Sequence, residues 1–368
     1  MLEKLKRPSY HKHILTQQPP PNHITAIVAR KPRGEINTTP QFTILHGNLF
    51  GHRPRAAYHS SMAEPNTYPQ TPTLLLILGM HRSGTSAIAK GVESLGLSLG
   101  EYLLGAAPDN PKGYWEDAEG VALNQKIFDR CDLRWNEARI LDTDDLLART
   151  QDLQRAARDL LASRISCWHR WAFKDPRTLR TLPIWLEAAA ELQLDTRALL
   201  VLRHPQEVCA SLAVRNQMNP LHAQLMWAAH WLPFLPRLRG RPLAVIDYEQ
   251  VITAPVPALE KVAGRLGYSV DAQQLRRYGE SFLDVTMRHH RASGDTPLLP
   301  LVTDAYDLLR ACGELSEAEF WSAWEGLQER HREWMGCYAL LDAETDWRRR
   351  RRSNWWRWTH GQWRSVAG

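Results

Sequence analysis

The sequence predicts a three-layer α/β fold in which a central parallel sheet is flanked by helices. Short apolar runs recur at residues 74–78, 171–173, 198–202 and 243–246, as expected of parallel strands that are buried on both faces. Segments with helical periodicity separate these runs. Strands that alternate with helices are typical of a parallel sheet covered on both sides, so the two observations together indicate this fold class.

The length and composition of the chain indicate one α/β core between two extensions. The chain has 368 residues, of which 43% are hydrophobic, enough to bury a sizeable core. Residues 1–70 are proline-rich and basic, and we expect them to be disordered. Residues 71–346 form the predicted folded domain, and residues 347–368 form a tail rich in arginine and tryptophan. The net charge of +6 resides in the two ends, so it says nothing about what the core binds.

The cysteines and the apolar runs favour a soluble protein of a reducing compartment. The five cysteines are scattered and include no CxxC pair, which argues against a disulfide framework and against a zinc site. The start of the chain is polar and proline-rich rather than signal-like, and the longest apolar run is far too short to span a bilayer. We therefore expect a cytoplasmic protein.

A glycine-bounded loop follows the first predicted strand. Four residues separate Gly79 from Gly84, and helix-compatible sequence follows. In such a strand–loop–helix unit, backbone N–H groups converge on an anion, which predicts a phosphate-binding loop. The nucleotide P-loop has Lys after its second glycine, where this chain has Thr85. The cation lies inside the loop instead, at Arg82, which indicates a phosphate ligand and argues against MgATP.

An acidic pair, Glu116 and Asp117, comes directly after two aromatic residues, Tyr114 and Trp115. A carboxylate whose pKa is raised by apolar neighbours can accept the proton of a hydroxyl group, and the aromatic rings could stack on a sugar or a phenol. The same two acids could instead open a helix at residues 118–129, where negative charge is favourable. The residues alone leave both interpretations open.

Cations end the next two predicted strands. Lys174 follows one apolar run and precedes the sequence Asp-Pro-Arg, while Arg203 follows the next run and Ser211 lies eight residues further on. A guanidinium offers forked donors to phosphate oxygens, and a hydroxyl in the following helix can add another. Either residue alone would be ordinary at a strand end or in a helix. Their spacing, taken with the upstream loop, favours a phosphate site.

The remaining elements complete the alternation of strands and helices. Helices are predicted at residues 146–165, 183–192, 222–231 and 257–266. Trp227 and His230 share one helical face and are predicted to pack in the core. Ser316 and Glu319 form a capping box. The helix that it opens carries an apolar stripe of Phe320, Trp324, Leu327 and Trp334.

Four of these segments, in order along residues 73–291, resemble the sulfotransferases that use 3′-phosphoadenylyl sulfate (PAPS). Residues 79–86, Gly-Met-His-Arg-Ser-Gly-Thr-Ser, resemble the 5′-phosphosulfate loop of a bacterial branch of that family, and residues 174–177, Lys-Asp-Pro-Arg, resemble a second motif of the branch. The resemblance implies a P-loop-like three-layer fold with a central parallel sheet. It also implies transfer of a sulfuryl group from PAPS to a hydroxyl of a glycan, glycolipid or small-molecule acceptor. No metal is required by this scheme.

The resemblance also implies roles for individual residues. Lys174 and Arg82 would stabilise charge during transfer. Glu116 would be the general base, with Asp117 as the second candidate and His81 as the third. Arg291 lies in a polar loop that could equally be plain surface. The residues implied to bind PAPS are Arg82, Ser83, Gly84, Thr85, Ser86, Arg203, Ser211 and Arg291.

Two departures from the family pattern bear on these roles. Cytosolic animal sulfotransferases carry a catalytic His two residues after the Lys that matches Lys174, and this chain has Pro176 there. The general base must therefore come from elsewhere. The same enzymes place a Trp just after the loop to stack on the adenine, and this chain has Ala87. The residue that contacts the adenine is therefore unassigned.

Two other function classes are open. One is a P-loop NTPase or small-molecule kinase, against which Thr85 argues. The other is a catalytically inactive protein of the same fold that associates with membranes or nucleic acid. The arginines and five tryptophans of residues 347–368 suit peripheral contact with an anionic membrane, here the inner face. They could also bind nucleic acid without sequence specificity, or form a solvated tail.

Overall fold

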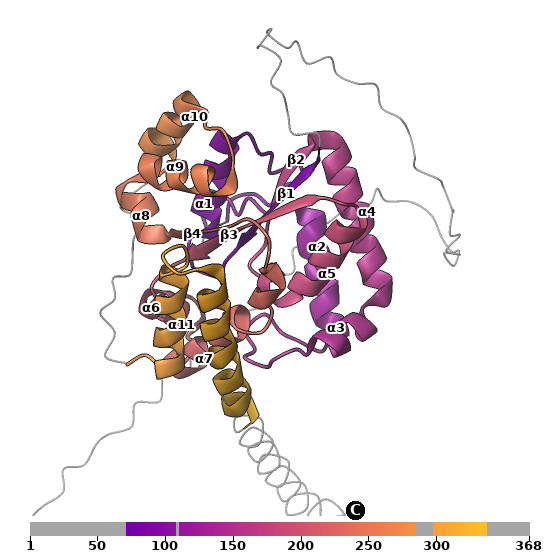
Figure 1. The fold of residues 1–368 in the computed structure, drawn as a ribbon, viewed down its shortest axis with the longest axis vertical. Helices are drawn as coiled ribbons and strands as arrows, with labels where there is room; N and C mark the ends of the chain where they lie inside the picture. The colour runs from indigo at the N-terminus through magenta and orange to yellow at the C-terminus, as the bar shows by residue number, and fades with distance from the viewer. Residues whose placement is uncertain (1–70, 108–109, 284–296, 337–368) are drawn as a thin grey trace, which may run out of the picture. The chain divides into compact units, whose positions relative to one another are not determined.

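A four-stranded parallel sheet forms the centre of the fold, which confirms the predicted α/β class (Figure 1). The computed structural model describes residues 71–107, 110–283 and 297–336. The strands lie in the order β2-β1-β3-β4. Their bounds are β1 Thr73–Leu78, β2 Arg170–Lys174, β3 Asp195–Leu202 and β4 Leu243–Asp247.

Helices connect the strands and cover the sheet. The α-helices are α1 Thr85–Gly91, α2 Ala118–Arg130, α3 Thr143–Arg149, α4 Gln151–Trp168, α5 Thr178–Glu191, α6 Pro205–Asn216, α7 Pro220–Trp231, α8 Tyr248–Thr253, α9 Pro255–Leu266, α10 Ala272–Arg277 and α11 Pro300–Arg310. Residues 317–336 form a further helix. The 3₁₀ turns are η1 Val92–Leu95 and η2 Leu235–Leu238, and a π-helical turn, η3, spans Tyr278–Phe282.

Alternate side chains of β1 enter two separate cores, because successive residues of a strand point to opposite faces. Leu74 and Leu76 join the core that contains α2, α4, α5, α6, α7 and α11. Leu75 and Ile77 join the core that contains α1, α8, α9 and α10. Figure 1 shows α2, α4 and α5 on one side of the strands and α8, α9 and α10 on the other. The unbroken apolar run of β1 is thus explained by burial on both faces.

Two of the predicted helices differ from the structure by more than two residues at one end or more. The helix predicted at 146–165 is divided into α3 and α4 at Thr150, whose hydroxyl donates to the carbonyl of Leu146 at 2.7 Å. Such a bond competes with the helical pattern of the backbone. Helix α5 begins before the predicted start, so Pro183 lies inside it. Almost every residue of its first half is buried, and tertiary packing outweighs the cost of an internal proline.

The predicted packing at the C-terminal side is confirmed. Trp227 and His230 are each 1% exposed. The Ser316 N–H donates to the Glu319 carboxylate at 3.0 Å and the Glu319 N–H donates to the Ser316 hydroxyl at 3.3 Å, so the capping box is formed. The apolar stripe behind it is buried at Phe320, Trp324 and Leu327.

The sheet topology identifies one edge at which a ligand is expected. The chain passes from β1 to β2 in one direction and from β3 to β4 in the other, so the strand order reverses between β1 and β3. In open α/β sheets, ligands bind outside the carboxyl ends of the strands at such a switch point. In the part of the chain that the structure describes, no helix is long and apolar enough to cross a membrane.

Candidate functional site

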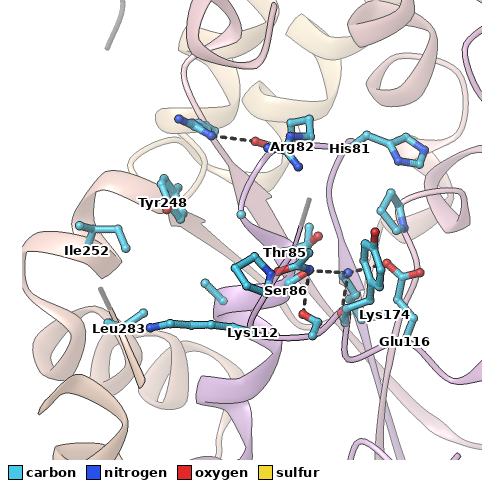
Figure 2. Close-up of a pocket in the computed structure, with 18 of the residues that line it drawn as sticks. His81, Arg82, Thr85, Ser86, Lys112, Glu116, Lys174, Tyr248, Ile252 and Leu283 are labelled. Carbon is cyan, nitrogen blue, oxygen red and sulfur yellow. Dashed lines mark hydrogen bonds and ion pairs between the residues drawn. The ribbon is translucent and has the colours of Figure 1, made fainter. Parts of the chain in front are cut away.

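A cavity of about 530 Å³ lies at the carboxyl ends of the strands. Figure 2 shows that side chains from the loop after β1, the end of β2 and the start of α8 converge on it. Its lining brings together seven of the residues implied by the sequence, which are Arg82, Gly84, Thr85, Ser86, Glu116, Lys174 and Arg203. His81, the third candidate for the base, also lines it. The predicted switch-point edge therefore holds the largest part of the predicted site.

The loop after β1 requires both of its glycines. Gly84 has φ +84°, and a Cβ there would lie 2.1 Å from the ring of Tyr248. A Cβ on Gly79 would lie 2.6 Å from Thr85 Cγ2 and 2.9 Å from the carbonyl of Val201. The glycines thus allow the loop to pack closely against β3 and α8. The loop amides then lead directly into α1, whose first N–H groups have no partner within the helix.

Arg82 and Arg203 brace one side of the loop. Arg82 has φ 68° and its Nε donates to the Ser211 hydroxyl at 2.8 Å. Arg203 donates to the carbonyl of Arg82 at 3.1 Å and forms an ion pair with Glu207 at 2.9 Å. Its guanidinium also lies 5.0 Å from the ring centroid of Tyr248. The two guanidiniums are therefore held beside the loop by contacts from β3, α6 and α8.

Ser211 and Ser83 stand behind the cavity lining. Each is only 1% exposed, and Ser211 acts on the cavity through Arg82 in this structure. The Ser83 hydroxyl is buried and has no hydrogen-bond partner within residues 71–107, 110–283 and 297–336. Arg291, the remaining residue implied to bind PAPS, lies outside the described residues.

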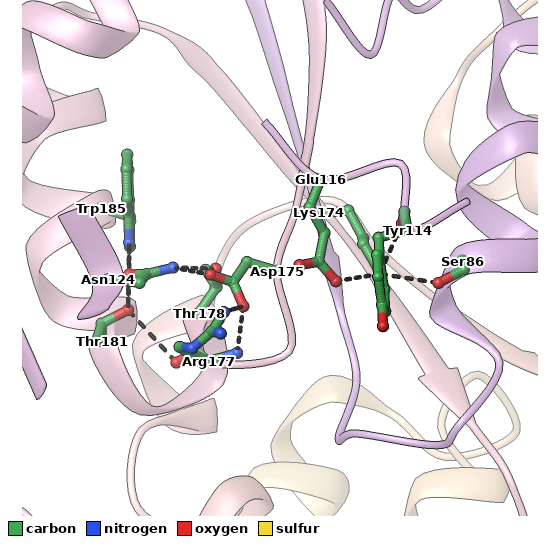
Figure 3. A network of polar contacts seen from close by, with 10 residues as sticks. All are labelled: Ser86, Tyr114, Glu116, Asn124, Lys174, Asp175, Arg177, Thr178, Thr181 and Trp185. Carbon is green, nitrogen blue, oxygen red and sulfur yellow. Dashed lines mark hydrogen bonds and ion pairs between the residues drawn. The ribbon is translucent and has the colours of Figure 1, made fainter. Parts of the chain in front are cut away.

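Lys174 is the centre of the other side of the cavity. Its Nζ donates to the Glu116 carboxylate at 2.6 Å, to the Tyr114 carbonyl at 3.0 Å and to the Ser86 hydroxyl at 3.1 Å (Figure 3). These three acceptors match the three N–H bonds of an ammonium group. Lys174 is 2% exposed. Its buried ammonium group therefore joins the buried Glu116 carboxylate to Ser86, at the start of the helix that follows the loop.

The environment of Glu116 suits proton transfer. Burial raises the pKa of the Glu116 carboxyl, while the neighbouring Lys174 ammonium acts in the opposite direction. The net shift is upward, because removal of a carboxylate from water disfavours its charged form. Glu116 is therefore a stronger base than an exposed glutamate and still has a cation beside it.

Asp117 has a structural role in this arrangement. Its carboxylate caps α2 by accepting from the N–H groups of Glu119 at 3.0 Å and Gly120 at 2.9 Å. It also pairs with Arg164 at 2.7 Å. The two interpretations of the acidic pair thus apply to different residues: Asp117 opens the helix, and Glu116 faces the cavity.

His81 lies at the cavity wall beside other rings. Its ring centroid is 5.1 Å from that of Trp135 and 5.8 Å from that of His230. Burial, followed by the nearby His230 and Arg177, lowers the pKa of His81 well below its usual range. A neutral imidazole with so low a pKa is a weak base, which places His81 behind Glu116 as a candidate.

A buried polar network that the sequence did not predict anchors the end of β2. Asp175 accepts from Asn124 of α2 at 2.9 Å and from Arg177 at 2.8 Å. The Asn124 amide oxygen in turn accepts from Thr181 at 2.7 Å and from Trp185 at 2.9 Å (Figure 3). This network holds the backbone at Asp175, the residue directly after Lys174. Its only signal in the sequence is an acid directly after a strand-end cation.

Several cavity residues were not among those singled out in the sequence. Tyr248 follows β4 as Arg203 follows β3, so the rule of strand carboxyl ends could have identified it. Lys112, Arg215 and Phe282 come from loops or a helix end, and no local pattern marks them. Lys112 is held by its Nζ, which donates to the carbonyl of Phe282.

Comparisons with solved structures find sulfotransferases at low identity. The sulfotransferase domain of the olefin synthase from Synechococcus PCC 7002 has a TM-score of 0.40 and 17% identity, covering 70% of this chain and 99% of that one. The sulfotransferase domain from the curacin biosynthetic pathway gives 0.39 and 17%, covering 65% and 98%. Retinol dehydratase in complex with androsterone and the inactive cofactor PAP gives 0.29 and 16%, covering 72% and 81%.

No protein-family model matches the chain, and no curated protein matches it significantly. The chain is therefore similar in structure to sulfotransferases only at low identity and with TM-scores below 0.5. The functional interpretation rests on the residues of the cavity themselves.

Proposed function

We propose that this protein is a PAPS-dependent sulfotransferase that transfers a sulfuryl group to a hydroxyl of its acceptor. The observation that carries the proposal is the position of Lys174 Nζ, 2.6 Å from the Glu116 carboxylate and 3.1 Å from the Ser86 hydroxyl at the start of α1, directly after the loop. A cation for the transferred group, a base for the acceptor and a loop for the donor phosphate are thus adjacent. Sulfuryl transfer needs these three parts in one place.

The charge of the cavity fits an anionic donor. Among the described residues, five cationic side chains line it, against the single carboxylate of Glu116; they are Arg82, Lys112, Lys174, Arg203 and Arg215. Such a preponderance of fixed positive charge attracts phosphate and sulfate groups. PAPS, when bound, supplies a sulfuryl group activated by its bond to phosphate. Arg82, Gly84, Thr85 and Ser86 would hold its 5′ end and Arg203 its 3′-phosphate, with the buried Ser83 and Ser211 supporting them from behind the lining.

The chain's own groups supply the remaining chemistry. The Glu116 carboxylate accepts the proton of the acceptor hydroxyl and becomes neutral. Its attraction for Lys174 then weakens, and the Lys174 ammonium is left to stabilise the oxygens that gain negative charge. Because both groups are almost fully buried, little water screens this effect.

We extend the proposal to the acceptor class, a glycan or glycolipid. Tyr114, two residues before Glu116, also lines the cavity, and an aromatic ring near a catalytic base offers a stacking surface for a sugar. Val214, which is 71% exposed, also lines the cavity and offers an apolar contact at its mouth. Membrane contact through residues 347–368 would bring the protein to a surface that carries glycolipids.

A turnover assay tests the proposal. Purified protein is incubated with PAPS and pooled hydroxylated acceptors, and adenosine 3′,5′-bisphosphate and sulfated products are measured by mass spectrometry. We expect bisphosphate to form with an acceptor present, and far less with Glu116→Gln. Hydrolysis of ATP with magnesium, in the absence of any sulfated product, would instead establish the NTPase or kinase class.

A further inference from the structure

Trp115 adopts a backbone conformation that is unusual for a bulky residue. Its φ is 57°, in the left-handed region that costs an L-residue about 1–2 kcal/mol. The residues on either side of it, Tyr114 and Glu116, are the two that supply main-chain and side-chain oxygens to Lys174. A costly conformation between two site residues needs a structural reason.

The left-handed turn directs both neighbours toward the same ammonium group. The Tyr114 carbonyl lies 3.0 Å and the Glu116 carboxylate 2.6 Å from Lys174 Nζ. The backbone is tied down beyond the turn, where the Leu104 N–H donates to the Glu116 carbonyl at 2.8 Å. The chain therefore turns at Trp115, between the two residues that contact Lys174. A change of the Trp115 φ would move either the Tyr114 carbonyl or the Glu116 carboxylate away from Lys174.

The ring of Trp115 is held from several directions. Its centroid lies 6.0 Å from that of Phe282 in an edge-to-face arrangement, and Lys90 Nζ of α1 lies 4.5 Å from its centroid. Gly113, with φ +94°, lies beside the ring, where a Cβ would make an ordinary contact at 3.5 Å. Aromatic pairs and cation–π contacts each contribute about 0.5–1.5 kcal/mol, which is enough together to offset the cost of the turn.

Phe282 connects the ring of Trp115 to α1, the helix that follows the loop after β1. It ends the π-helical turn η3 and stacks on Tyr278, with ring centroids 5.8 Å apart and planes 22° apart. The Tyr278 hydroxyl donates at 3.1 Å to the carbonyl of Ala87 in α1. Trp115, Phe282 and Tyr278, which we call the aromatic clasp, thus tie the segment bearing Glu116 to the helix that follows the loop.

We infer that Trp115 is a positioning residue: the aromatic clasp holds its left-handed turn, and the turn keeps Glu116 on Lys174. The role in sulfuryl transfer rests on the proposed function. The positional claim stands on the contacts alone, so the two can be tested separately.

The test measures the titration of Glu116 directly. Protein labelled with ¹³C at the glutamate carboxyls is titrated by NMR, and the Glu116 signal is assigned by its loss in Glu116→Gln. In Trp115→Ala we expect the pKa of Glu116 to fall toward that of an exposed glutamate, because the carboxylate leaves its buried position. Trp115→Phe should retain more of the upward shift than Trp115→Ala. Trp168→Ala, which removes a tryptophan from the surface of the other core, should leave the Glu116 titration unchanged.

A Glu116 titration in Trp115→Ala that equals that of the unaltered protein would overturn the inference, even if thermal stability falls. If Trp115→Ala does not fold, Phe282→Leu provides the same readout through the other half of the clasp, with the same expected and contradicting results. The activity arm separates the two claims. A shifted titration in a protein whose unaltered form transfers no sulfuryl group would keep the positional claim and remove the proposed function.

Discussion

Two ion pairs at the carboxyl edge of the sheet differ in how they are assembled. Lys174 of β2 pairs with Glu116 across 58 residues of sequence at 2.6 Å, and Arg203 after β3 pairs with Glu207 one helical turn away at 2.9 Å. The local pair forms wherever its strand and helix form. The distant pair exists only when β2, α1 and the segment before α2 are in place. Under the proposed function, the β3 side braces the ligand and the β2 side carries the chemistry.

The largest expected effect is the loss of the base. Glu116→Gln should lower kcat by about 10²- to 10⁴-fold, the usual contribution of general base catalysis. The unaltered protein should lose activity as pH falls through the raised pKa of Glu116, above the ordinary value of about 4.3, because the base is active only as carboxylate. The variant should lose this acid limb of the pH profile.

Glu119→Gln is the matched control, since Glu119 lies in the same segment but its side chain is 66% exposed. It should keep both rate and pH profile. An acid limb that persists unchanged in Glu116→Gln would assign the base to another group.

The second effect concerns the cation of the same pair. Lys174→Met should lower kcat by about 10²- to 10³-fold, as expected for removal of one preorganised electrostatic donor. It should also destabilise the fold by about 3–5 kcal/mol, because Glu116 would be left buried without its partner. Chemical denaturation measures this loss.

The double variant Glu116→Gln with Lys174→Met separates the two consequences. It should recover much of the stability, since no unpaired charge remains, and none of the activity. Equal stability of the single Lys174→Met variant and the unaltered protein would contradict the buried pair.

A smaller effect is expected on the β3 side. Arg203→Ala should weaken adenosine 3′,5′-bisphosphate binding by about 10- to 100-fold, because a hydrogen bond to a charged group contributes about 1.5–3 kcal/mol. The effect should fall on affinity more than on kcat. Arg197→Ala, at the opposite end of β3 and also paired with an acid, Asp195, should leave affinity unchanged. Calorimetric titration compares the two variants.

The smallest effect is expected at Ser211. Ser211→Ala removes the acceptor of Arg82 Nε, which should lower affinity or rate by about tenfold or less, in line with about 1 kcal/mol for one hydrogen bond. Ser94→Ala is a matched control, because Ser94 is a buried serine that donates to a backbone carbonyl elsewhere, that of Gly91 at 2.7 Å. A larger loss of bisphosphate affinity in Ser211→Ala than in Arg203→Ala would contradict the assignment of the larger binding contribution to Arg203.

The parts that sequence could predict are those in which a local pattern carries the chemistry. The loop between Gly79 and Gly84, Lys174 and Arg203 each follow an apolar strand, so their convergence follows from parallel topology. From the residues alone, the roles of Glu116 and Asp117 could not be distinguished, because the two acids are adjacent and alike; the family resemblance alone placed Glu116 first. The structure distinguishes the two acids through Arg164, which is distant in sequence and forms an ion pair with Asp117.

Two local conformations of the site could not be predicted from the sequence pattern either. The ring of Tyr248 over Gly84 and the left-handed turn at Trp115 arise from packing between segments far apart in the chain. Tertiary contacts of this kind override local preference, and functional sites are where such departures are expected.

Binding of adenosine 3′,5′-bisphosphate, measured by calorimetry against ATP with magnesium, tests the central claim most directly. The account predicts that the bisphosphate binds without a metal and more tightly than MgATP, and that Arg203→Ala weakens this binding while Arg197→Ala does not. Tight binding of MgATP with no detectable binding of the bisphosphate would contradict the account and place the protein among the P-loop NTPases.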